Sequence, residues 1–146
     1  MTTHNPVDTN IVAHDFLVAM HGKLEQEKID AAVTALKAAR AAYPATITFA
    51  NMVFYTVIEV QITGGETFRG TMGGLTTPGG GTAFGAMVYT DDLDALYANT
   101  VSFQLNVTPV YLSILFFDAQ NNLLGSCQAG AIATTIGVGG GKGEWS

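Results

Sequence analysis

The residues of this chain that could carry out nucleophilic, acid–base or metal chemistry are few. Cys127 is the only cysteine, so no disulfide can form within the chain, and no histidine lies near it in the sequence to activate a thiolate. We therefore interpret Cys127 as a small buried apolar residue. The histidines, His4, His14 and His21, all lie near the N-terminus, and their spacing matches no metal signature. Beyond His21 no histidine is available as a general base near neutral pH.

A group of acids, Asp91, Asp92 and Asp94, has the composition of a cation-binding loop. A calcium loop of the EF-hand type also needs glycine at its sixth position and a distal glutamate, but the sixth residue counted from Asp92 is Tyr97. Thr90 precedes the acids and is a good helix-capping residue, and acids in a first helical turn complement the helix dipole. We therefore predict that these acids begin a short helix and bind no metal.

Two further patterns are weak candidates for catalysis. The run VGGGKG, from Val138 to Gly143, has the composition of a phosphate-binding loop, but Gly143 follows Lys142 where that motif requires Ser or Thr. We predict a turn here, before a last strand. Glu59 and Glu66 could form a carboxylate pair for acid–base catalysis, but we expect both to be exposed on a polar face. The sequence therefore predicts no catalytic, cofactor-binding or metal-binding residue, and no enzymatic activity.

The composition indicates one globular domain with few charges. Of the 146 residues, 48% are hydrophobic and 12% charged, and the net charge is −6 with six basic residues. Binding to a phosphate backbone needs clustered basic side chains, so nucleic acid is excluded as a partner. The N-terminus has neither a basic region nor a following apolar run, so we expect no signal peptide in this chain. No run of about 18 apolar residues predicts a membrane-spanning helix.

The elements fall into two parts that meet at Pro44. One glycine precedes Pro44 and sixteen follow it. Residues 24–43 are rich in alanine and predict a helix that ends at Pro44, with Ile29, Val33, Leu36 and Tyr43 along one apolar stripe. A shorter helix over residues 11–20 precedes it. This extension, residues 1–44, either packs on the following domain, binds a membrane or partner, or is loosely attached.

Residues 45–146 predict an all-β domain. Residues 101–107 alternate between apolar and polar side chains, as expected for a half-buried strand. Glycine-rich turns separate the strands, a pattern typical of a sandwich or barrel, and one short helix from Thr90 to Tyr97 covers an end. The other predicted strands are Thr46–Ile62, Thr67–Leu75, Thr82–Tyr89, Val110–Phe117, Leu123–Ala129, Ala131–Val138 and Gly143–Ser146.

Several segments after Ala45 resemble the shared core of the virulence-associated (Vap) proteins of pathogenic actinobacteria. They occur in the same order as in that family. The most distinctive are Gly73–Leu75 with Pro78-Gly79, Tyr89–Leu93 with Leu96-Tyr97, Phe116–Asp118, and Gly137–Gly141 with Trp145.

The resemblance implies a compact, eight-stranded antiparallel β-barrel with one short helix and a glycine-rich outer surface. It also implies a secreted, non-enzymatic virulence factor that acts on host endolysosomal membranes or a host protein, and it transfers no catalytic residue. The alternative is a small barrel that binds an apolar ligand or a protein partner, unrelated to virulence. The volume inside the barrel discriminates between them, because inward-facing residues should fill it: Phe103, Leu105, Leu112, Ile114 and Phe116.

Overall fold

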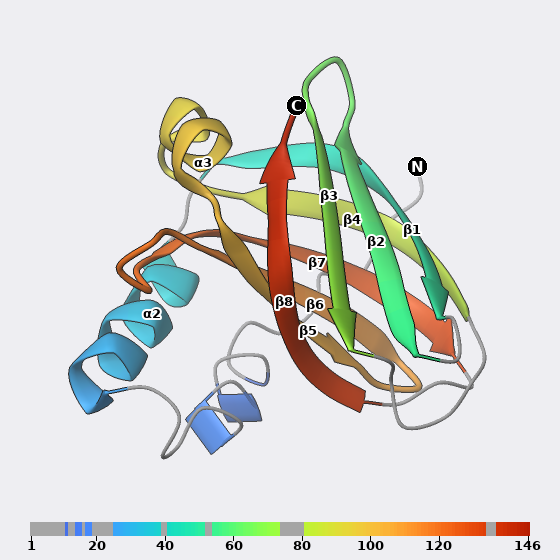
Figure 1. The fold of residues 1–146 in the computed structure, drawn as a ribbon, viewed down its shortest axis with the longest axis horizontal. Coiled ribbons are helices and arrows are strands. Elements are labelled where there is room, and N and C mark those ends of the chain that lie inside the picture. The colour runs from blue at the N-terminus through green and yellow to red at the C-terminus, as the bar shows by residue number, and fades with distance from the viewer. Residues whose placement is uncertain are drawn as a thin grey trace.

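The computed structural model describes residues 11, 14–15, 17–18, 25–38, 41–51, 54–73, 81–133 and 137–146 (Figure 1). Residues 11, 14–15 and 17–18 are helical, within the helix expected over residues 11–20. The remaining described residues form two helices and eight strands. In chain order these are α2 (Gln26–Ala38), β1 (Ala42–Asn51), β2 (Tyr55–Ile62), β3 (Thr67–Gly73), β4 (Gly81–Tyr89), α3 (Leu93–Asn99), β5 (Ser102–Val107), β6 (Tyr111–Phe117), β7 (Leu123–Ala133) and β8 (Gly137–Trp145).

The strands form one closed antiparallel barrel in the order β1-β2-β3-β8-β5-β6-β7-β4. This confirms the predicted eight-stranded barrel and decides between barrel and sandwich. Only the start of β1 pairs with β4, from Ala42 opposite Tyr89 to Pro44 opposite Met87. Closure pairs every strand with two neighbours, so the sheet has no free edge.

Large aromatic side chains fill the barrel interior. The rings of Phe68 and Phe116 meet edge to face with centroids 4.9 Å apart, and those of Phe68 and Phe103 are 5.4 Å apart. Trp145 joins them at 5.5 Å from Phe68. The residues predicted to fill the interior are buried in this core: Phe103, Leu105, Leu112, Ile114 and Phe116.

Glycines on neighbouring strands make room for these rings. A Cβ atom at Gly70 would lie 2.5 Å from the Phe103 ring, and one at Gly143 would meet the Phe68 ring. Real side chains do not approach so closely. The glycines within β3 and β8 therefore allow a narrow barrel to hold large aromatic residues on adjacent strands.

The two helices cover different parts of the barrel. On α2, Ile29 and Ala32 are buried against the outer face of β6, in a second apolar cluster that includes Tyr111, Leu115 and Phe117. Strand β6 is consequently buried on both faces. This supports the interpretation that the predicted helix packs on the domain. The side chain of Leu36, predicted in the same stripe, lies outside the described residues.

Helix α3 lies at one end of the barrel, as predicted for the helix that follows Thr90 (Figure 1). It runs from Leu93 to Asn99 and not from Thr90 to Tyr97, and its N-cap is Asp92 and not Thr90. The Asp92 carboxylate accepts a hydrogen bond of 3.0 Å from the Ala95 backbone N–H. Leu96 is buried, and the Tyr97 ring lies 5.3 Å from the Trp145 ring.

The N-terminal part of the barrel differs from the prediction. The helix expected to end at Pro44 ends at Ala38, and Pro44 lies inside β1. Tyr43 is also in β1, where it pairs with Val88 of β4. The cause is tertiary: barrel closure supplies strand partners to a segment whose alanine content favours helix locally.

Three boundaries within the barrel also differ. The run Thr46–Ile62 is divided between β1 and β2. Phe54, which alternation along this run places on one face with Ile58, Val60 and Ile62, lies before β2 with 85% of its surface exposed. Strand β7 continues to Ala133, so it includes Gly130, which separates the predicted strands Leu123–Ala129 and Ala131–Val138. The glycines of VGGGKG lie inside β8, so the predicted turn there is wrong. Glycine content indicates a turn when read locally, whereas here it serves the packing of neighbouring side chains.

Candidate functional site

Cys127 is the only thiol of the chain and faces the barrel interior. It pairs with Ile114 of β6 and Val88 of β4 and is completely buried. Burial raises the pKa of the thiol above its ordinary value, because an apolar interior disfavours the thiolate. The group is therefore protonated and inaccessible at neutral pH, which confirms its interpretation as a buried apolar residue.

The acids of the sequence do not converge on a metal or catalytic site. Among the residues that the structure describes, no three His, Cys, Asp or Glu side chains are placed to hold a metal ion. Glu59 instead pairs with Arg69 of β3 at 3.3 Å on the exposed surface. Glu66 lies in the connection between β2 and β3, where its backbone N–H donates to the Tyr97 hydroxyl at 3.2 Å. His14 lies in the helical N-terminal segment, and His4 and His21 lie outside the described residues.

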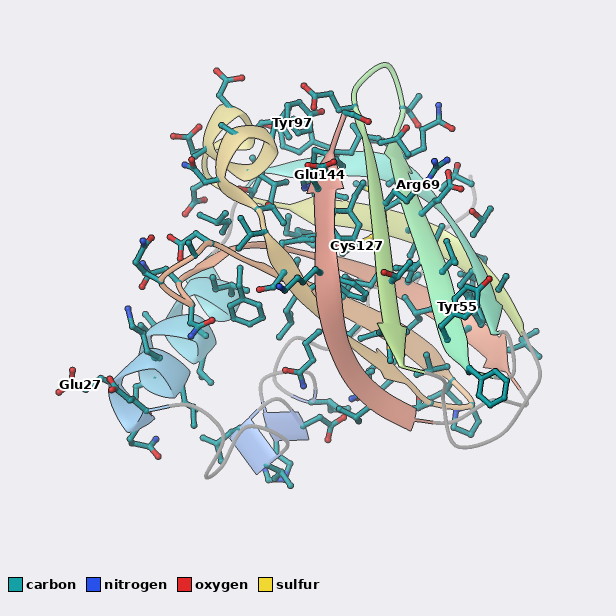
Figure 2. All side chains as sticks on the ribbon, in the orientation of Figure 1. Glu27, Tyr55, Arg69, Tyr97, Cys127 and Glu144 are labelled. Carbon is teal, nitrogen blue, oxygen red and sulfur yellow. The ribbon has the colours of Figure 1, made fainter. Side chains whose placement is uncertain are left out.

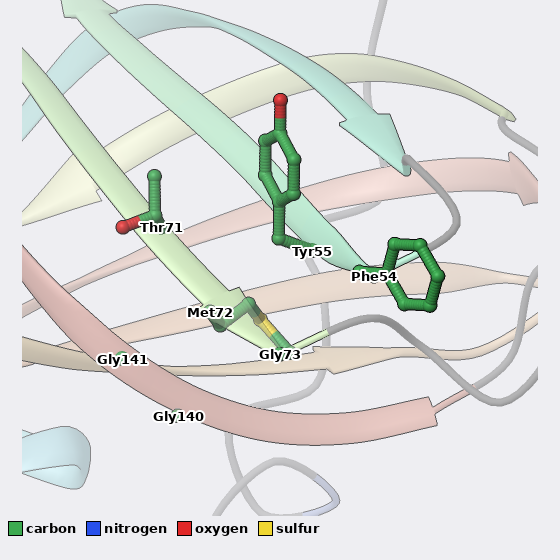
Figure 3. Close-up of a pocket in the computed structure, with 7 residues that line it drawn as sticks. All are labelled: Phe54, Tyr55, Thr71, Met72, Gly73, Gly140 and Gly141. Carbon is green, nitrogen blue, oxygen red and sulfur yellow. The ribbon is translucent and has the colours of Figure 1, made fainter.

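A shallow pocket of about 510 Å³ opens on the outer side of β2, β3 and β8 (Figure 3). Phe54 and Tyr55 form one side of it, at the start of β2. Tyr55 pairs with Gly73 at the end of β3, and Met72 pairs with Gly141 of β8. The pocket is lined by Phe54, Tyr55, Thr71, Met72, Gly73, Gly140 and Gly141.

The lining determines what this pocket can do. It contains no carboxylate, amine, imidazole or thiol, so it provides no strong acid, base or nucleophile. Phe54 and Tyr55 present aromatic surface, with 85% and 48% of their surface exposed. The glycines leave backbone accessible along one wall. The arrangement suits the binding of an uncharged, largely apolar group.

Alternation in the sequence places Phe54 on one face with Ile58, Val60 and Ile62. The alternation is correct for these three, which are buried. Phe54 is an even number of residues from these three, but it precedes the first residue of β2, so strand alternation does not apply to it. No signal in the alternation itself marks this strand boundary.

Residues 2–146 match the family model described as Rhodococcus equi virulence-associated protein. The chain belongs to this family. The match confirms the resemblance found in the motifs of the barrel. Among curated proteins, no significant match is found.

Two solved structures from Rhodococcus equi have the same barrel as this member of the virulence-associated family. The virulence-associated protein VapD is 35% identical with a TM-score of 0.67, and the match covers 73% of this chain and 97% of VapD. VapB is 38% identical with a TM-score of 0.63, over 73% of this chain and 96% of VapB. No helix in the part of the chain that the structure describes is long and apolar enough to cross a membrane.

Proposed function

We propose that this chain is a secreted, non-enzymatic virulence factor that acts on host endolysosomal membranes. Its family supports a role in virulence. The observation that carries the proposal is the filled barrel: aromatic and aliphatic side chains occupy the interior, so recognition takes place on the outer surface. There the described pocket is apolar and uncharged.

The absence of enzymatic activity is supported by the chemistry of the groups described above. The thiol is buried and protonated, Glu59 is paired with Arg69, and Asp92 caps α3. These three groups are thus accounted for by structural roles. A protein can disturb a membrane by binding to it, without catalysing any covalent reaction.

We favour a membrane over a host protein because the exposed pocket residues suit an apolar partner that makes few directional hydrogen bonds. Phe54 and Tyr55 combine apolar area with one hydroxyl, which suits the boundary between lipid chains and water. The second candidate, a module that binds a small apolar ligand, is restricted to this outer pocket, because side chains occupy the space inside the barrel.

Helix α2 is less available to a membrane than its sequence suggests. Its apolar residues Ile29 and Ala32 are packed on the outer face of β6. Lys28 also donates a hydrogen bond of 2.7 Å to the side-chain oxygen of Asn122, in the connection between β6 and β7. Insertion of α2 would require these contacts to break, so we assign the first membrane contact to the barrel.

Vesicle co-sedimentation at two pH values tests the proposed function. We expect weak binding of the full chain to vesicles containing anionic lipid at pH 7, where its net charge of −6 is repelled. Binding should strengthen near about pH 4.5–5, as carboxylates in general begin to protonate and the negative charge falls. No binding at either pH would refute membrane action and favour a host protein as the partner.

A further inference from the structure

The two ends of the barrel differ in character. At one end, the helix end, lie α3, the connection between β6 and β7 and the C-terminus (Figure 1). At the opposite end lie the ends of β1, β3, β5 and β7 and the starts of β2, β4, β6 and β8. We call it the uncharged end, because the strand ends that meet there carry no charged residue. The antiparallel order fixes this assignment, because successive strands run in opposite directions.

Exposed large apolar side chains gather at the uncharged end. Val110 lies in the β5–β6 connection and is 71% exposed, and Ile132 lies near the end of β7 and is 72% exposed. In the barrel, Val101 is the exposed large apolar residue beside the helix end, between α3 and β5. The exposed apolar residues at the uncharged end are Phe54, Tyr55, Phe84, Val110, Ile132 and Val138.

The charges of the barrel have the opposite distribution. Residues 41–58, 70–90, 95–117 and 119–141 contain no charged residue, and each of these stretches includes one strand end and the following strand start at the uncharged end. Strand pairing places Glu59, Arg69 and Glu144 in one row, and Glu144 is next to the last residue of β8 (Figure 2). The other charged residues from Ala41 onward lie at the helix end or on the adjoining half of β8: Glu66, Asp91, Asp92, Asp94, Asp118 and Lys142.

The separation is large enough to matter electrostatically. Tyr55 and Glu59 are four residues apart on β2, which corresponds to about 13 Å along a strand. The screening length at physiological ionic strength is about 8 Å. A bilayer that touched Tyr55 would therefore be largely screened from the acidic groups of the barrel. On the flank facing the N-terminal segment, the Tyr111 hydroxyl donates to the Asp15 carboxylate, which marks the limit of the uncharged surface.

We propose that the uncharged end of the barrel enters the headgroup region of a phospholipid bilayer, with the acidic helix end directed toward water. The proposal rests on the proposed membrane function and names its contact surface. The apolar residues belong to β2, β4, β7, β8 and two connections, so they surround an end and do not line one groove that a peptide would occupy. Barrel closure pairs the strands with one another, so this end can approach lipid without a free sheet edge.

Binding of the full chain to phosphatidylcholine vesicles at about pH 5 tests this surface with a matched pair of variants. Val110→Ser and Val101→Ser make the same chemical change at exposed positions on opposite ends. We expect Val110→Ser to weaken binding several-fold, because it removes apolar area from the contact. We expect Val101→Ser to bind as the unaltered chain does. The double variant Phe54→Ser, Val110→Ser should weaken binding at least about tenfold.

The outcomes separate this inference from the proposed function. Thermal melts followed by circular dichroism should be alike for all variants, because the altered side chains are exposed. If the unaltered chain binds vesicles and the Phe54 and Val110 variants bind equally well, the contact surface is wrong while the membrane function stands. If Val101→Ser weakens vesicle binding as much as Val110→Ser does, the assignment of the contact to the uncharged end is also wrong. If the unaltered chain binds neither these vesicles nor anionic ones at either pH, both proposals fall.

Discussion

Gly139 and Gly141 lie two residues apart on β8, on the same side of the strand, yet a side chain at each would meet a different obstacle. A Cβ atom at Gly141 would fall on the backbone carbonyl oxygen of Thr71 in β3. One at Gly139 would meet the terminal methyl of Met72, at the end of a flexible side chain that can adopt another rotamer. The requirement for glycine is therefore strict where backbone is the neighbour and mild where a mobile side chain is.

This difference predicts unequal effects of the same substitution. We expect Gly141→Ala to lower the free energy of unfolding by about 1–3 kcal/mol, because strands β3 and β8 must move apart. We expect Gly139→Ala to change it by less than about 1 kcal/mol, since Met72 can yield and alanine restricts the unfolded chain. Urea unfolding of both variants measures these values. Equal destabilisation would show that all glycines of β8 are required for the same reason.

At the scale of elements, barrel closure depends on a short segment that the sequence assigns to the helical extension. Ala42, Tyr43 and Pro44 provide the pairing of β1 with β4. The backbone N–H of Thr90 also donates to the Ala41 carbonyl oxygen at 3.2 Å. We therefore expect the shortest chain that folds into a closed barrel to begin near Ala41, before the composition shift at Pro44.

Two truncated chains test this boundary. A chain that begins at Ala41 should retain its β circular-dichroism spectrum and unfold cooperatively, although loss of α2 uncovers Leu115 and Phe117 and favours association. A chain that begins at Thr46 lacks the β1–β4 pairs and should melt at a lower temperature, because the barrel is left open. Identical melting of the two chains would contradict the role of these three residues in closure.

At the scale of the whole molecule, the two ends of the barrel differ in charge. The fluorescence of its single tryptophan reports on one of these ends. Trp145 lies at the helix end, against Tyr97 of α3. If the uncharged end contacts the bilayer, brominated lipids should leave the fluorescence of bound protein nearly unquenched. In the variant Val110→Trp, the added indole should be quenched on binding. Strong quenching of Trp145 in the unaltered chain would instead place the helix end against the membrane.

The sequence by itself predicted an all-β domain, which the family resemblance narrowed to a barrel, and it predicted several of the buried strand faces. Alternation along Phe103, Leu105 and Val107 is a local property of a strand, so it identified these three as buried. Val101, at the start of the same run, is exposed because it precedes β5, and Gln104 on the opposite face is buried. The order of distinctive motifs identified the family, which the family model confirms. The short helix after Thr90 was predicted from capping chemistry, which is also local, although the capping residue is Asp92 and not Thr90.

Only the tertiary structure decided the features that depend on residues distant in sequence. Pro44 became part of a strand because β4 lies beside it, and the glycines of β8 became strand residues because Phe68 and Met72 of β3 occupy the space beside them. The uncharged end likewise forms only when strand pairing brings together the ends of strands that are distant in sequence. Local propensity contains no information on these partners, because each contact is set by closure of the barrel.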